Sequence, residues 1–230
     1  MRQIMNELAL QPHHNKSISA GHPGFDIDVF SQADPDRGRL ERFIKGGFYQ
    51  HYQADIAITM PHLLAIQDGG VKAALGIRSG LNPLFIEQYL PCAIENMPCF
   101  SAKASKRSEI VEIGSLYSNS QQLTIPLFLV TATTLYLLNK KHMVFCGTSH
   151  ILNLVSRAGV STTFLADARQ DRLFASEDNW GCYYLTQPKV VSAELDSIMA
   201  IIEGNVFYNK QLLRLSEKIA RVCQKMEGEF

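Results

Sequence analysis

The sequence predicts a single α/β domain built on a mixed β-sheet with helices on both faces. Segments with the alternation of strands are interspersed along the chain with segments that have the 3.6-residue period of helices. Hydrophobic residues make up 46% of the 230 residues and charged residues 19%, as is typical of globular proteins. A chain of this length can bury a full hydrophobic core.

The beginning of the chain is expected to be loosely ordered. Residues 1–38 are rich in His, Pro, Gly, Asp and Ser, and the cluster DPDRGR near their end is typical of a linker. Glu7 interrupts the apolar residues at the start, so we expect no secretory signal. The folded domain, including its C-terminal helices, is predicted to span residues 39–230.

The first half of this domain contains helix and hairpin patterns. RLERFIKGGFYQHY predicts a short helix that ends at Gly46-Gly47. HLLAIQ and VKAALGIR predict a β-hairpin, because the Asp-Gly-Gly between them supplies the positive φ angles of a tight turn. LFIEQYL predicts a short helix and EIVEIGSLYS a strand. An apolar helix is expected over residues 123–139, with Pro126 in its first turn.

The second half continues the alternation. HMVFCGTS predicts a strand, and HILNLVSRAGV a helix with Gly159 at its C-cap. TTFLADA and WGCYYLTQPKVV predict later strands. Two helices, LDSIMAIIEG and NKQLLRLSEKIARVCQKM, are expected at the end of the chain. The apolar stripe of the second one is compatible with packing on the domain or on a second subunit of a homodimer.

Charge and cysteine usage exclude several classes of protein. Because 22 basic residues balance 22 acidic ones, nothing favours nucleic acid or an anionic membrane as the main partner. The five cysteines are odd in number and never spaced as CxxC, so we expect neither a disulfide framework nor a metal site, and a reducing cytoplasmic location. The apolar run from Leu123 to Leu138 is shorter than the roughly 20 residues that span a bilayer, so it predicts a buried helix.

Glu112 is the main candidate for a catalytic group. In a regular strand it shares one face with Ile110, Gly114 and Leu116, while the odd-numbered residues 111–117 share the other. A carboxylate on an apolar face is either paired or has a raised pKa, and a raised pKa suits a general base.

Two interpretations of Glu112 therefore stand side by side, a general base and an ion pair with Arg78 or Arg157. Gly114, in the middle of the strand, indicates a bulge or the close approach of a ligand. Together the two residues favour a ligand at this strand.

Two other segments offer weaker signals. The junction YSNSQQLT, residues 117–124, supplies free backbone N–H groups at a helix start, which suits a phosphate, but it has no glycine and so matches neither a P-loop nor a dinucleotide fingerprint. Cys146 has His150 four residues later, compatible with a Cys–His nucleophile pair or with a buried small side chain. No GxSxG motif supports a serine hydrolase.

WGCYYLTQPKV contains the chain's only tryptophan and two adjacent tyrosines. As a strand it would place the even-numbered residues 180–184 on one face and Tyr183 on the other. Two interpretations are open, core packing by Trp180 and the wall of a pocket lined by a tyrosine, which has an apolar ring with a polar tip.

Six blocks together resemble the thermostable hemolysin family of proteobacterial proteins. They are VKAALGIR, LFIEQYL, IVEIGSLYS, VFCGTSHILNLVSRAGV, FLADARQDRL and WGCYYLTQPKV, in order within residues 56–191. That family in turn resembles GNAT-type acyltransferases and acyl-homoserine-lactone synthases. The resemblance implies a GNAT-like mixed sheet, splayed between the Glu112 strand and VFCGTS, with a pantetheine-linked acyl group in the gap.

The resemblance also implies an activity: transfer of an acyl group longer than acetyl from a thioester, acyl-CoA or acyl carrier protein, to a small-molecule amine. Glu112 would accept the amine proton, and backbone N–H groups of Gly114, Ser115 and Leu116 would stabilise the oxyanion. The phosphopantetheine would contact Leu116, Ser118, Asn119, Ser120, Gln121 and Gln122. The substrates would be bordered by Arg78, Glu87, Cys146, Thr148, Trp180, Tyr183 and Tyr184. The acyl thioester is then a co-substrate, and no tightly bound cofactor is expected.

The sequence departs from these patterns in three places. The two glycines of the GNAT pyrophosphate loop are absent from YSNSQQLT, Ser115 stands where the family tends to carry Asn, and an arginine expected near Leu152 is missing. A carrier-protein donor or a lost activity is compatible with these changes. Two other function classes therefore stay open, a membrane-active hemolysin that acts directly on bilayers and a non-catalytic GNAT-like binding protein of a biosynthetic operon.

Overall fold

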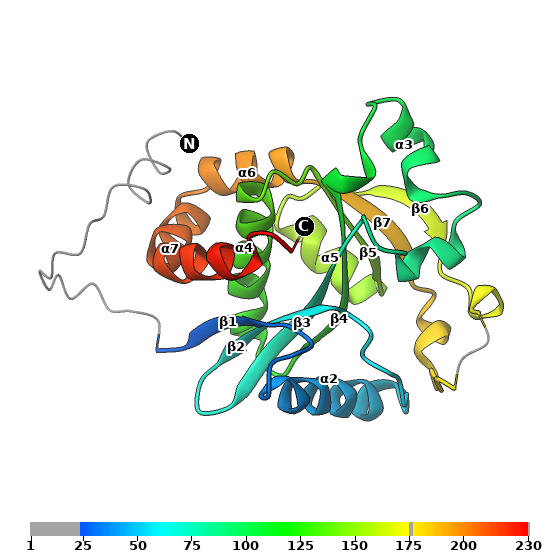
Figure 1. The fold of residues 1–230 in the computed structure, drawn as a ribbon, viewed down its shortest axis with the longest axis horizontal. Coiled ribbons are helices and arrows are strands. Elements are labelled where there is room, and N and C mark those ends of the chain that lie inside the picture. The colour runs from blue at the N-terminus through cyan, green and yellow to red at the C-terminus, as the bar shows by residue number, and fades with distance from the viewer. Residues whose placement is uncertain (1–23, 175–176, 230) are drawn as a thin grey trace, which may run out of the picture.

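The computed structural model describes residues 24–174 and 177–229 (Figure 1). They form one seven-stranded sheet with the strand order β1-β2-β3-β4-β5-β7-β6. Within the described chain only β4 and β5 pair in parallel, and the other neighbours are antiparallel. The strands are β1 Asp26–Phe30, β2 His62–Gln67, β3 Val71–Ser79, β4 Ile110–Ser118, β5 His142–Gly147, β6 Thr163–Asp167 and β7 Lys189–Glu194. The predicted mixed sheet and the β2–β3 hairpin are confirmed.

Helices cover both faces of the sheet, as predicted. One face carries α2 (Arg37–Tyr52), the 3₁₀ helices η1 (Phe85–Tyr89) and η2 (Ile94–Asn96), and the short α3 (Pro98–Ser101). The other face carries α4 (Gln121–Leu137), α5 (Ser149–Arg157), α6 (Leu195–Gly204) and α7 (Val206–Met226). Short 3₁₀ turns η3 (Arg107–Glu109), η4 (Gln170–Arg172) and η5 (Tyr183–Thr186) complete the described elements.

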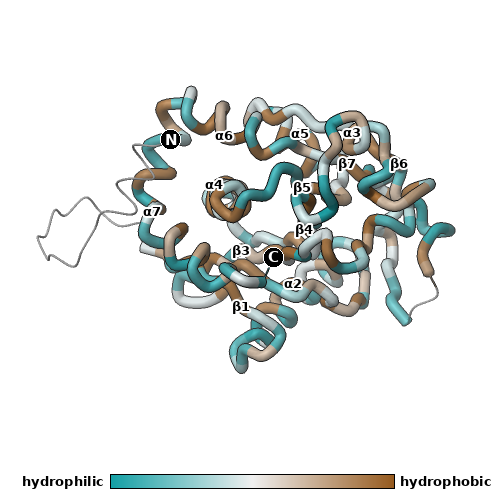
Figure 2. Tube along the Cα trace, turned by 45° about the horizontal axis from the view of Figure 1, so that its top comes forward, coloured by the Kyte–Doolittle hydropathy of each residue, from teal (hydrophilic) through white to brown (hydrophobic). Residues whose placement is uncertain are grey.

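The apolar stripe of α7 packs on its own domain. Figure 2 shows α4 end-on, between α7 and the central strands. The α7 stripe joins the same buried cluster as α4 and the sheet, with Leu212, Leu215, Ile219, Val222 and Met226 buried. The sequence left open whether this stripe packs on the domain or on a second subunit, and the structure places it on the domain.

The first 38 residues differ from the predicted loose segment. Residues 1–23 lie outside the described part of the chain, but Asp26–Phe30 form the edge strand β1, paired along its whole length with β2. Ile27 and Phe30 are buried. The alternation in DIDVF is short and contains two aspartates, so its strand pattern is weak in the sequence.

Two helices differ from their predicted limits. α2 runs through Gly46-Gly47, and Gly47 is a packing position and not a helix end: a Cβ there would lie 2.3 Å from the ring of Tyr117. α4 begins at Gln121, so Pro126 lies inside the helix and not in its first turn. Among the described residues, no helix has both the length and the hydropathy needed to cross a bilayer.

The segment predicted as the strand WGCYYLTQPKVV is mostly a turn and a 3₁₀ helix, and β7 begins only at Lys189. Gly181 has a φ of +50° and lies against the end of α2, where an added Cβ would be 2.0 Å from the carbonyl oxygen of Tyr52. The N–H of Cys182 donates to that oxygen at 2.8 Å. The glycine therefore lets the segment dock on α2, and the predicted division of its residues between two strand faces was wrong.

Candidate functional site

The sheet opens between β4 and β5. These strands pair only from Ile110 opposite His142 to Ile113 opposite Phe145. Beyond that pair β4 continues to Ser118 and β5 to Gly147 without pairing to each other. The predicted splay between the Glu112 strand and the VFCGTS strand is confirmed.

A β-bulge lies in β4 directly beyond this opening. Ala74 of β3 pairs with Tyr117, but two residues later Gly76 pairs with Gly114, so β4 contains one extra residue. Ser115 in the bulge has a φ of +50°. The bulge confirms the expectation that Gly114 marks an irregularity in this strand.

The bulge also reverses the faces of the residues that follow it. Leu116 packs with the cluster on the α4 side of the sheet, whereas Tyr117 contacts Phe43 of α2 with ring centroids 4.8 Å apart. The prediction that Leu116 shares a face with Glu112 was therefore wrong, because strict alternation holds only in an unbroken strand.

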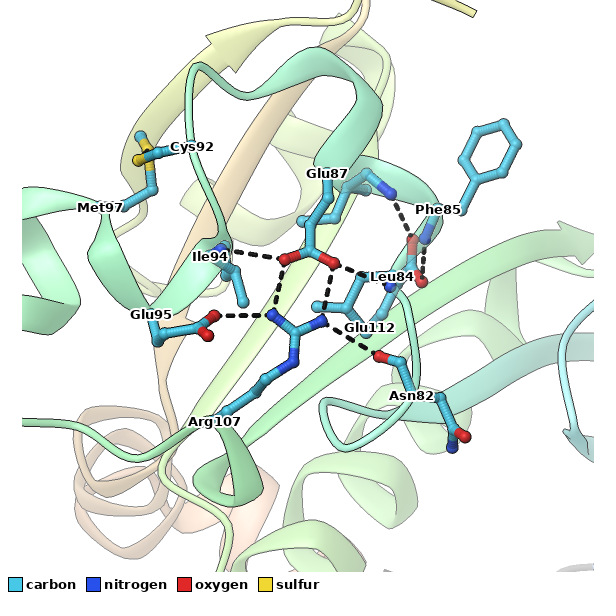
Figure 3. Close-up of polar contacts among 11 residues, drawn as sticks. Asn82, Leu84, Phe85, Glu87, Cys92, Ile94, Glu95, Met97, Arg107 and Glu112 are labelled. Atoms are coloured by element: carbon cyan, nitrogen blue, oxygen red, sulfur yellow. Dashed lines mark hydrogen bonds and ion pairs between the residues drawn. The ribbon is translucent and has the colours of Figure 1, made fainter. Parts of the chain in front are cut away.

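Glu112 is 1% exposed and is held by three donors, of which Figure 3 shows the N–H group of Phe85. The N–H groups of Phe85 and Ile86, at the start of η1, donate to its two oxygens at 2.9 and 3.0 Å. Arg78 Nη1 donates at 3.3 Å, so the ion pair with Arg78 exists, while Arg157 lies on α5, against the other face. Burial raises the pKa of Glu112, and Arg78 and the two N–H groups act in the opposite direction.

Arg78 connects Glu112 to the segment that leads from α2 to β2. It is 9% exposed, and its Nη2 donates to both the carbonyl oxygen and the hydroxyl of Thr59, each at 2.9 Å. The predicted substrate-binding residue Arg78 thus lies next to Glu112, and its described hydrogen bonds go to Glu112 and Thr59.

Glu87, another predicted substrate-binding residue, belongs to a separate ion-pair cluster (Figure 3). Arg107 donates to both of its oxygens at 2.6 and 2.7 Å, and the N–H groups of Leu84 and Ile94 donate at 3.0 Å. Arg107 also pairs with Glu95. Burial alone would raise the pKa of Glu87, but these donors lower it to about 2. The cluster fixes the chain around η1, and η1 supplies the two N–H donors of Glu112.

The aromatic residues of the 180–184 segment gather on the Glu112 side of the sheet. Tyr183 is 8% exposed, with its ring centroid 5.3 Å from those of Trp180 and Tyr184. The hydroxyls of Tyr184 and Tyr89 are 2.6 Å apart. The buried aromatic of the segment is thus Tyr183, with its hydroxyl close to Cys146, whereas Trp180 is half-buried beside it; the pocket wall stays a prediction.

Cys146 and Thr148 lie at the end of β5, beside the opening. The thiol of Cys146 is 3.6 Å from the hydroxyl of Tyr183, and burial raises its pKa to about 12. Thr148 precedes α5 and shares a hydrogen bond with Tyr52. A thiol with a raised pKa is a poor nucleophile, and the described polar contact of Cys146 is Tyr183 and not His150. Cys146 is partly buried and packs against the cluster around η1, so its contacts favour a small packed side chain over a Cys–His pair.

The junction between β4 and α4 matches the predicted phosphate site in position. Ser120 occupies the N-cap of α4, and no described side chain caps the first turn. The hydroxyl of Ser118 donates to the carbonyl oxygen of Ser120 at 2.8 Å, and the N–H of Asn119 donates to Lys72. The N–H groups of Gln121 and Gln122 open this helix, and such groups suit an anion.

An apolar cavity of about 80 Å³ lies between the sheet and helices α4, α5 and α6. One water molecule needs roughly 10–15 Å³ by the same measure, so the space is several times larger. Ile113 and Phe145, the last pair before the strands diverge, are part of its lining. Thr131 and Tyr208 are the polar residues of the lining. The cavity is not predictable from the sequence, because apolar residues that line a cavity have the same pattern as those that fill a core.

No group of three or more His, Cys, Asp or Glu side chains arranged to hold a metal ion occurs in the described residues. Among proteins with curated descriptions, none matches this sequence.

Several solved structures share the fold. The acyl-homoserine lactone synthase LasI matches with a TM-score of 0.50 and 12% identity, over 74% of this chain and 90% of that one. TofI, crystallised with an inhibitor and MTA, matches with a TM-score of 0.53 and 8% identity, over 74% and 91%. The CoA-dependent synthase BjaI matches with a TM-score of 0.53 and 11% identity, over 78% and 88%. These likenesses confirm the predicted GNAT-like fold.

The family assignment rests on the sequence itself. The family model described as thermostable hemolysin matches residues 30–199, which include β2 to β7, the strand opening and the Glu112 site. This match covers well over half of the chain, and the chain therefore belongs to the thermostable hemolysin family.

Proposed function

We propose that this protein is an acyltransferase that moves an acyl group longer than acetyl from a thioester to a small-molecule amine. The observation that carries the proposal is the opening between β4 and β5 together with the apolar cavity lined by Ile113 and Phe145, the last pair before the opening. A thioester in the opening would have its acyl chain in the cavity and its carbonyl group at the bulge. Burial of an alkyl chain there is favourable by about 0.8 kcal/mol per methylene.

The bulge is suited to polarise the thioester carbonyl. Beyond Ile113, β4 has no partner on its β5 side, so backbone N–H groups between Gly114 and Leu116 that point to that side are free of sheet hydrogen bonds. Their donation to the developing oxyanion is the kind of contact whose loss commonly costs about 3–4 kcal/mol.

Glu112 is the proposed acceptor of the amine proton, directly or through a water molecule. The new C–N bond replaces the C–S bond of the thioester, and the proton passes on to the departing thiolate. It precedes Gly114 by two residues on the same face, and its burial raises its pKa towards the range of a general base. Arg78 and the start of η1 fix the carboxylate, so the base would be positioned before the substrate arrives.

The junction at Ser118 to Gln122 is the proposed binding site for the phosphopantetheine end of the donor, in acyl-CoA or in an acyl carrier protein. Tyr183, Tyr184 and Trp180 would border the amine.

Mass spectrometry of lipid extracts tests this proposal. Cells that express the wild type are expected to contain a new N-acyl amine that is absent from cells with Glu112→Gln. Cavity variants such as Ala132→Phe are expected to shorten the acyl chain of that product, because Ala132 lines the cavity. Identical extracts from wild-type and empty-vector cells would contradict the proposal.

A further inference from the structure

Two glycines form a notch on the α2 face of the sheet, directly above the bulge. Gly76 of β3 and Gly114 of β4 are register partners, so neither strand has a side chain at this point. The side chain of Met60 occupies the notch. A Cβ on Gly114 would lie 2.1 Å from Met60 Cε, and one on Gly76 would lie 2.2 Å from Met60 Cγ.

Met60 is fixed by its backbone and not by a polar side-chain contact. Arg37 donates to the carbonyl oxygens of Met60 and Pro61, and Arg78 donates to Thr59. Met60 itself is 5% exposed. A methionine side chain is unbranched and changes rotamer easily, so it can adapt to a ligand while its backbone stays in place.

The proposed role of Glu112 puts this position next to the incoming amine. If Glu112 accepts the proton, the amine must approach from the face on which Glu112 lies, and Gly114 presents that same face to Met60. Any substituent on the amine then competes with Sδ and Cε of Met60 for the space above Gly114.

We propose that Met60 sets the size of the amine acceptor, so that the wild type favours short primary amines. The proposal rests on the function proposed above and makes Met60 a specificity-determining residue. It predicts that a shorter side chain admits longer amines, because Met60→Ala removes the three heavy atoms Cγ, Sδ and Cε.

The test feeds an equimolar mixture of ethylamine, butylamine and hexylamine to cells that express each variant. N-acyl amides, both native and derived from the mixture, are quantified by mass spectrometry. Met60→Ala is expected to raise the ratio of hexylamide to ethylamide at least about tenfold, since one methylene in a fitted pocket is worth about 10- to 200-fold. Met60→Leu ends one atom earlier but keeps the volume, so it is expected to fold and to shift the ratio in the same direction by less.

Met97→Ala is the matched control. Met97 is also buried, at 7% exposure, but it packs with Ile86 of η1 and Ile94 of η2 and not against Gly114. It is expected to leave the ratio unchanged. Wild-type product together with unchanged ratios in both Met60→Ala and Met60→Leu would overturn the role of Met60 and leave the acyltransferase proposal intact. Absence of every N-acyl amide from wild-type cells would overturn the acyltransferase proposal itself, and this inference with it.

Discussion

Replacement of Arg78 by methionine tests how Glu112 is held in the folded protein. The variant removes the buried cation, which is 3.3 Å from the Glu112 carboxylate, and leaves the N–H groups of Phe85 and Ile86 in place. Loss of one partner of a buried ion pair commonly costs about 3–5 kcal/mol. At about 2–4 °C per kcal/mol for a chain of this size, the melting temperature is expected to fall by roughly 6–20 °C at pH 8.

The loss is expected to be smaller at pH 5. Burial raises the pKa of Glu112, and without Arg78 the pKa rises further. While the folded wild type keeps Glu112 protonated, the missing cation is not needed, and ionisation of the unfolded chain destabilises both proteins equally. As the pH rises through the folded-state pKa of the wild type, its Glu112 ionises beside Arg78 while that of the variant stays protonated, so the stability deficit of the variant grows.

The two hydrogen bonds to Thr59 are lost at every pH and account for a remainder of about 1–3 kcal/mol. Thermal unfolding of the wild type and Arg78→Met at pH 5, 6, 7 and 8 separates the pH-dependent loss from the pH-independent loss. The double variant Arg78→Met, Glu112→Gln is expected to show a stability deficit that does not change with pH, because it has no carboxyl to ionise at this position. A deficit of equal size at pH 5 and pH 8 would refute the assignment of Arg78 as the partner of an ionised Glu112.

Three other predictions concern stability. The donors around Glu87 lower its pKa to about 2, so they stabilise the fold above pH 4.5 and lose this effect as the pH falls towards 2. The urea midpoints of the wild type and Glu87→Gln are therefore expected to differ at pH 7 and to converge near pH 2. Gly181→Ala is expected to lower the free energy of unfolding by about 3 kcal/mol, because of its positive φ and the displaced hydrogen bond between Cys182 and Tyr52. Gly204→Ala is the control: a Cβ there meets nothing within 4 Å, so this variant is expected to be nearly neutral in thermal unfolding. Gly114→Ala is expected to lower the free energy of unfolding by about 1–3 kcal/mol in the wild type, but by close to nothing in a Met60→Ala background. Equal losses in both backgrounds would contradict the contact with Met60 Cε.

The sheet could be predicted from the sequence because its signals are local. The Asp-Gly-Gly turn specifies the β2–β3 hairpin, and Gly159 ends α5 with a φ of +87°. Glu112 stood out for a similar reason, as a carboxylate in an apolar strand whose burial required a partner. Arg78 was one of two candidate partners in the sequence, and the β3–β4 register selects it, since Arg78 is directly opposite Glu112.

The sequence predictions that were wrong or incomplete depend on contacts between residues far apart in the chain. Gly47 is required within α2 by the close approach of Tyr117, and Gly181 is required in its turn by the close approach of the Tyr52 backbone. Neither contact is visible in a sequence window. Met60 was missed because a single methionine between apolar residues carries no signal, and its place follows only from the alignment of Gly76 with Gly114 across two strands.

The contacts of Glu112 also determine how its substitution must be interpreted. Both carboxylate oxygens accept hydrogen bonds from described donors, and a glutamine has only one oxygen to offer them. In Glu112→Gln the amide NH₂ group would therefore face an N–H or guanidinium donor, and the variant is expected to lose stability as well as a base. Loss of product alone does not separate these effects. A wild-type rate that rises with pH as Glu112 ionises, together with a folded but inactive Glu112→Gln at low temperature, would identify the base; a flat pH profile would leave Glu112 as the residue that anchors η1.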